Sequence, residues 1–137
     1  MKIELTEKQF RRLVDLVYVG NWVLNSTRES DDRIVEYDEI EGAILSHCPS
    51  AGMGELVRVQ PEGCFPSKAF EDGGIHEAIA DYEDAMFFEI LAEELAQRDM
   101  ELEHIPRDNM RELIKRKDEY MDEFEANGTA NLVVDKL

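Results

Sequence analysis

The chain has 137 residues and a net charge of −17, and 43% of its residues are apolar. This length and apolar content are typical of one globular domain, so we expect a single helical domain over residues 1–137. The charge excludes nucleic acid and anionic membranes as expected partners, because a strongly acidic surface repels both.

The expected compartment is the cytoplasm. The longest apolar stretch, residues 16–24, is too short to cross a bilayer, and the first residues lack the apolar core of a secretory signal. The two cysteines, Cys48 and Cys64, are too few for a disulfide framework. A reducing compartment suits such a chain.

The first helix is predicted to begin after Thr6. Thr6 and Gln9 have the spacing of a capping box, in which each side chain satisfies a free backbone N–H of the other residue. A polar break follows at residues 25–30. The side chains expected to face the core are Phe10, Leu13, Val14, Val17 and Trp22.

A second helix is predicted from a cap at Ser30 or Asp31 to the Cys48-Pro49 pair. Apolar residues recur three or four positions apart in this segment, which predicts a buried stripe. The stripe consists of Ile34, Tyr37, Ile40, Ile44 and Cys48.

Residues 49–74 interrupt the helical pattern with five glycines and three prolines. Residues 55–59 have the composition of a short strand that ends at Gln60-Pro61. Loops of this length are often functional or mobile. We slightly favour an ordered cover over one end of the helices.

The longest helix is predicted from Asp72 or Gly74 to about Asp99. It carries two apolar stripes, which predicts packing on two sides and, on one of them, a second copy of the chain. The expected homodimer interface is Phe87, Leu91 and Leu95. The other stripe consists of Ile75, Ile79, Tyr82, Met86 and Ile90.

A last helix is predicted with Pro106 in its first turn and its end at Asn127-Gly128. Two short segments, residues 2–5 and 131–134, have a strand-like pattern and are candidates to pair. The expected fold class is therefore mainly α. It is a bundle of about four helices with a long Gly/Pro-containing loop and an optional small β element that joins the termini.

Two acidic pairs are the candidate metal ligands, with Mg²⁺ or Mn²⁺ as the expected ion. Glu36 with Glu39, and Asp81 with Asp84, each lie on one helix face, and adjacent helices would bring the four carboxylates together. Chance alone predicts about seven acidic pairs at this spacing. The chain has seven, so the pattern does not favour metal over a solvated acidic face.

Other catalytic and metal patterns are incomplete. His47, Cys48, Cys64 and His76 are zinc-type residues, but they lack the paired spacing of a structural zinc site. Neither a nucleophile elbow nor a phosphate-binding glycine loop is present in the sequence. The chain carries no motif that we assign to a known family.

The preferred function is an interaction or self-assembly module without catalysis, with no cofactor. A homodimer is the expected assembly, and the charge suits a basic protein partner. The alternative is a divalent-metal-dependent nucleotide or small-molecule hydrolase that uses the two acidic pairs.

Overall fold

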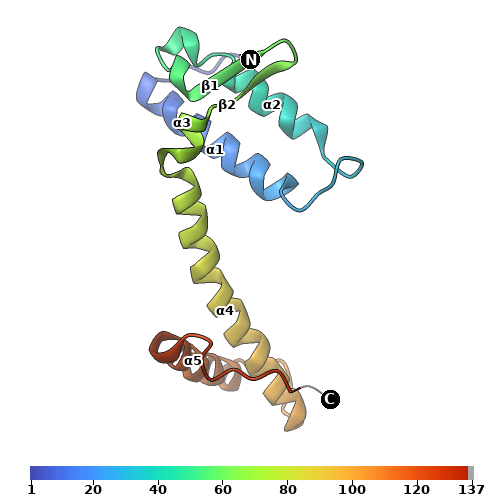
Figure 1. The fold of residues 1–137 in the computed structure, drawn as a ribbon. Coiled ribbons are helices and arrows are strands. Elements are labelled where there is room, and N and C mark those ends of the chain that lie inside the picture. Colours follow the sequence, from blue (N-terminus) through green and yellow to red (C-terminus); the bar gives the residue numbers. More distant parts are fainter. Residues whose placement is uncertain (136–137) are drawn as a thin grey trace. The chain divides into compact units, whose positions relative to one another are not determined.

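The computed structural model describes residues 1–135 and is mainly α-helical with a small two-stranded sheet, as predicted (Figure 1). The chain forms two compact units, which we call unit 1 (Met1–Ile79) and unit 2 (Ala80–Leu137). The single domain expected from the length stays a prediction. The long helices are α1 (Glu7–Asn25), α2 (Val35–Leu45), α4 (His76–Leu102) and α5 (Met110–Asn127).

The capping box predicted for α1 is confirmed. The Gln9 backbone N–H donates to Thr6 Oγ1 at 3.2 Å, and the Thr6 N–H donates to Gln9 Oε1 at 2.9 Å. Val14 and Tyr18 of this helix are buried in the core of unit 1. Phe10 and Trp22 pack against the same core, whereas Leu13 and Val17 are only partly buried.

The predicted start of α2 is wrong by three or four residues. Neither Ser30 nor Asp31 caps this helix, which begins at Val35 without a side-chain cap of its own. Instead, the Ile34 N–H donates to Asn25 Oδ1 at 2.9 Å. The cap therefore comes from α1, through a tertiary contact that local sequence patterns do not reveal.

The buried face of α2 also differs from the predicted stripe. Leu45 and Cys48 are buried and Ile44 packs on the core, but Tyr37 and Ile40 are exposed. The reason is that α2 turns a partly polar face toward α1, as described below.

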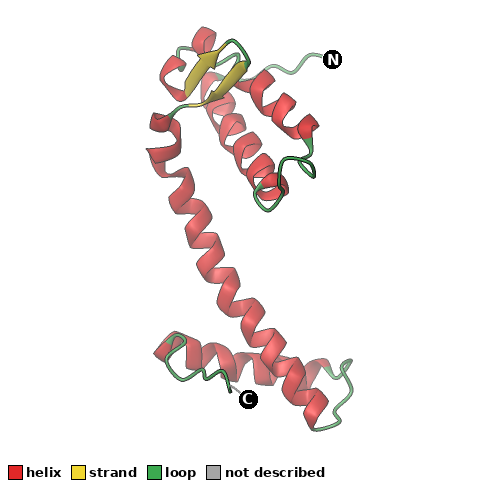
Figure 2. Ribbon diagram, turned by 45° about the vertical axis from the view of Figure 1, so that its right-hand side comes forward, coloured by secondary structure: helices red, strands yellow, loops and turns green. Residues whose placement is uncertain are grey.

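Residues 49–75 form short elements in place of an open loop (Figure 2). The 3₁₀ turns η1 (Pro49–Ala51) and η2 (Gly54–Leu56) lead into a hairpin of β1 (Val57–Gln60) and β2 (Gly63–Pro66). The predicted strand overlaps β1, and β2 was not predicted. The helical turn α3 (Lys68–Phe70) follows, and its Phe70 is buried in the core of unit 1.

The predicted strand pairing of the two termini is wrong. Residues 2–5 and 131–134 have no strand structure, and the sheet found in residues 1–135 is the β1–β2 hairpin. Both terminal segments lack partners that would satisfy a row of backbone groups, whereas β1 and β2 are joined by a tight turn and pair locally.

A wide turn, η3 (Glu71–Ile75), leads from α3 into α4. Gly74 has φ +102° there, a left-handed conformation that favours glycine. The start of α4 at His76 is close to the predicted one, and its end at Leu102 lies slightly beyond Asp99.

In unit 2, α5 packs against α4. Asn109 Oδ1 caps α5 by accepting the Glu112 N–H at 3.2 Å, so the prediction that Pro106 opens this helix is wrong. The end at Gly128 is as predicted. Within residues 1–135, no helix combines the length and apolar character needed to cross a membrane.

Candidate functional site

A ladder of buried amides joins α1 to α2 in unit 1. Asn25 is 1% exposed and its Nδ2 donates to Asn21 Oδ1 at 2.7 Å and to the Ile34 carbonyl at 3.1 Å. Asn21 Nδ2 in turn donates to Asp38 Oδ1 at 2.9 Å. Among the described residues, every buried side-chain nitrogen and oxygen has a hydrogen-bond partner.

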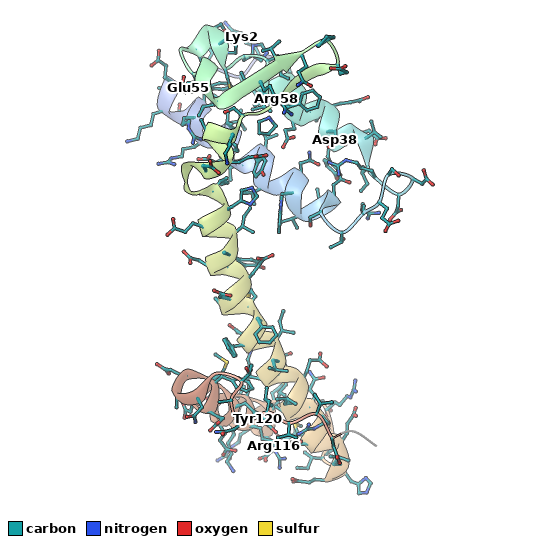
Figure 3. The ribbon with its side chains drawn as sticks, viewed as in Figure 1. Lys2, Asp38, Glu55, Arg58, Arg116 and Tyr120 are labelled. Atoms are coloured by element: carbon teal, nitrogen blue, oxygen red, sulfur yellow. The ribbon has the colours of Figure 1, made fainter. Side chains whose placement is uncertain are left out.

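Asp38 is also the partner of Arg33, which lines the same region of unit 1. Arg33 Nε and Nη2 each donate to the Asp38 carboxylate at 2.6 Å and form a bidentate ion pair that satisfies both charges. Figure 3 labels Asp38 on α2. The Arg33 hydrogen bond is the largest cause of the lowered pKa of Asp38, and the amide of Asn21 acts in the same direction.

A pocket of about 440 Å³ opens beside this ladder, which we call the polar pocket. Its volume is within the range of small-molecule sites. It lies entirely within unit 1. The residues around it include Tyr18, Asn21, Trp22, Arg33, Glu41 and Glu71.

Two carboxylates of the polar pocket have no cationic partner among the ion pairs of residues 1–135, namely those of Glu41 and Glu71. Burial raises the pKa of Glu41, and the charge of Asp38 adds to this, while the Asn21 amide and Arg33 oppose it. Burial likewise raises the pKa of Tyr18, with further contributions from the charges of Glu71 and Glu41. The polar pocket therefore contains two acidic side chains, Glu41 and Glu71, that no ion pair neutralises in the described residues.

The aromatic wall of the polar pocket is held by His76. Tyr18 Oη lies 2.6 Å from His76 Nε2, and the His76 ring meets the Trp22 ring edge-on with centroids 6.4 Å apart. Tyr18 also packs edge-on against Phe70 at 5.0 Å. These contacts fix the ring of Tyr18, which is 9% exposed.

In unit 2, charged and aromatic contacts join α4 to α5. Tyr120 Oη donates to Asp99 Oδ2 at 2.5 Å, and Arg116 bonds the carboxylate of Glu103 at 2.6 Å. Figure 3 labels Arg116 and Tyr120 on α5. Lys117 Nζ lies 3.0 Å from Glu89 Oε1. These ion pairs and hydrogen bonds connect α5 to α4.

The face of α4 that contacts α5 is not one of the predicted leucine-rich stripes. Ala92, Ala96 and Met100 of α4 are buried, and Ala96 and Met100 form a cluster with Leu113 of α5. Phe88 of α4 also contacts α5, with its ring centroid 5.5 Å from the ring centroid of Phe124. Other large apolar residues of α4 lie on exposed faces of the helix, among them Phe87, Ile90 and Leu102.

The predicted interface residues lie on such a face. Phe87 is 53% exposed, and Leu91 and Leu95 are partly buried. Leu102, seven positions beyond Leu95, is 73% exposed. We call the set Phe87, Leu91, Leu95 and Leu102 the α4 stripe.

The predicted metal ligands are all exposed, and they belong to different units. Glu36 and Glu39 lie on α2 in unit 1, and Asp81 and Asp84 lie on α4 in unit 2. In the part of the chain that the structure describes, no group of three or more His, Cys, Asp or Glu side chains is arranged to hold a metal ion. The Mg²⁺ or Mn²⁺ site stays a prediction, as does the hydrolase that depends on it.

Sequence reasoning missed the polar pocket. One signal was present: Asn21 and Asn25 lie four apart within an otherwise apolar helical run, and buried asparagines need partners. Nothing in the sequence distinguished Glu41 from the other acidic residues, because its burial is set by the packing of α2 against α1.

Comparisons with known proteins yielded no match: no family model, no curated protein and no solved structure is similar to this chain.

Proposed function

We propose that this chain is a self-assembly module that forms a homodimer through the α4 stripe. The observation that carries the proposal is that Ala96 and Met100 of α4 pack with Leu113 of α5, while Phe87 and Leu102 stay exposed outside this cluster. Burying each large apolar side chain stabilises an assembly by roughly 1.5–3 kcal/mol. Burial of Phe87 and Leu102 would contribute most, because their side chains are the most exposed of the α4 stripe.

The small core of unit 2 supports the same proposal. Among its described residues, the buried apolar side chains are Ala92, Ala96, Met100, Leu113 and Phe124. Units below about 70 residues seldom supply enough core by themselves and are commonly completed by association. A second copy adds apolar surface to a helical hairpin that has little of its own.

A twofold dimer is the simplest arrangement that covers the α4 stripe. In such a dimer the same patch of each subunit meets its equivalent, so a self-complementary apolar stripe needs no second surface. The expected occupant is therefore another copy of this chain, and a basic protein partner is the competing outcome.

Aspartate substitutions test this interface. Phe87→Asp or Leu91→Asp places a charge in an apolar contact, which is costly without a partner for the charge. We expect the molar mass measured by light scattering to fall from that of two chains toward that of one. Phe87 is the safer site, because its ring is already half exposed and its loss should leave unit 2 folded.

Leu16→Asp is the matched control. Leu16 is a leucine on another helix, α1, and is 71% exposed. This variant should keep the mass of the unmodified protein. Equal behaviour of Leu16→Asp and Phe87→Asp would contradict an interface at the α4 stripe.

A further inference from the structure

The polar pocket of unit 1 has a charge pattern that the proposed self-assembly does not use. Arg33 forms its bidentate ion pair with Asp38, and no ion pair in the described residues joins it to Glu41 or Glu71. Glu41 and Glu71 face the pocket as carboxylates without an ion-pair partner in the described part of the chain. A bound cation would neutralise the charge of these two carboxylates.

The side chains that line the pocket favour an organic cation over a metal ion. Trp22 and Tyr18 offer aromatic surface, and aromatic faces attract ammonium and guanidinium groups. Asn21 and Asn25 have their amides committed to the ladder between α1 and α2. A compact metal ion would need several converging oxygen ligands, and no such group is found in residues 1–135.

We propose that the polar pocket binds a small organic cation, with its ammonium or guanidinium group between the carboxylates of Glu41 and Glu71 and its aliphatic stem beside Trp22. Charge-assisted hydrogen bonds to the carboxylates would hold the head group. The volume of about 440 Å³ accommodates such a molecule.

Trp22 provides the direct readout, because it is the only tryptophan in the chain. Its fluorescence is to be followed while butylguanidinium is added to the full-length protein at constant ionic strength. We expect a saturable change with a half-point at or below about 1 mM. Butylurea, which is close in shape but neutral, should produce no saturable change.

Carboxamide variants then test the two carboxylates. Glu41→Gln and Glu71→Gln keep the size of the side chain, and each should weaken binding by about tenfold or more. Glu36→Gln on the same helix α2 is the matched control, because Glu36 is exposed and does not line the pocket. It should bind as the unmodified protein does. Circular dichroism confirms that each variant is folded.

Three results would overturn the proposal. The first is the absence of a saturable change up to about 10 mM butylguanidinium. The second is an equal response to butylurea or to Mg²⁺ alone, which would indicate a solvent effect or a metal site. The third is unchanged affinity in both Glu41→Gln and the exposed-loop variant Glu71→Gln, since the latter is expected to fold whatever the role of Glu41.

Discussion

Asn25 connects two helices with a single side chain. It donates to Asn21 and to the Ile34 carbonyl, and it accepts the Ile34 N–H, so it closes α1 and begins α2. A buried amide of this kind is useful because each of its partners would otherwise be an unsatisfied polar group. The connection between the helices therefore depends on a residue that looks unremarkable in the sequence.

Replacement of Asn25 is expected to lower the stability of the protein. Asn25→Ala should lower the free energy of unfolding by about 2–3 kcal/mol, because it leaves buried polar groups without partners. Chemical denaturation measures the effect. Asn127→Ala is the control: Asn127 is exposed and bonds Glu123 at 3.1 Å, and its loss should change stability by no more than about 0.5 kcal/mol. Similar values for the two variants would contradict the role given to Asn25.

Tyr120 lies in an environment that shifts its pKa. Burial and the hydrogen bond to Asp99 raise its pKa above the usual value. The folded state therefore holds the phenol proton more tightly than the unfolded state does. The contribution of this proton to the free energy of unfolding is fully present below a pH of about 10. It is lost as the pH rises through the raised pKa of Tyr120.

Tyr120→Phe should accordingly cost about 1 kcal/mol at neutral pH, where the bond to Asp99 is lost. It should also make stability fall less steeply above a pH of about 10. Urea denaturation at a series of pH values measures both effects. Tyr82→Phe is the control, because Tyr82 is 64% exposed. A pH profile that is the same in Tyr120→Phe and the unmodified protein would show that Tyr120 is not the titrating group.

At the scale of elements, the turn before α4 depends on Gly74. A Cβ at this position would meet no atom within 4 Å, but its φ of +102° is strained for other residues. Gly74→Ala should therefore lower stability by about 1–2 kcal/mol through the backbone alone. Gly73 is next to it, with φ −83° and equally open space.

Gly73→Ala thus isolates the conformational effect. It should be neutral or should raise the free energy of unfolding by up to about 1 kcal/mol, because alanine restricts the unfolded chain. Thermal denaturation of the two variants side by side makes the comparison. Equal changes in stability for the two alanine variants would contradict the importance of the left-handed conformation at Gly74.

The elements that the sequence predicts well are those fixed by neighbouring residues. Thr6 and Gln9 define the start of α1, and Gly128 defines the end of α5, through contacts within a few positions. The start of α2 was missed because its cap is Asn25, nine residues away. The polar pocket was missed because it depends on which helices meet. The packing of Ala96 and Met100 on α5 was missed for the same reason.

At the scale of the whole molecule, the charge is the dominant feature. Residues 29–48 and 75–104 hold 17 acidic and two basic side chains of a chain with net charge −17. Like charges on a surface repel over roughly 10 Å at 0.1 M salt. The melting temperature should therefore rise between low salt and about 0.5 M sodium chloride. A decrease would mean that the ion pairs of the protein outweigh this repulsion.

In the proposed homodimer, two copies of the chain associate through the α4 stripe. The direct measurement is the sedimentation equilibrium of the unmodified protein at micromolar concentration, with and without chelator. One chain has a mass of 15.8 kDa, and we predict the mass of two chains in both conditions. A mass of one chain across this concentration range would contradict the homodimer and leave the α4 stripe without the partner proposed for it.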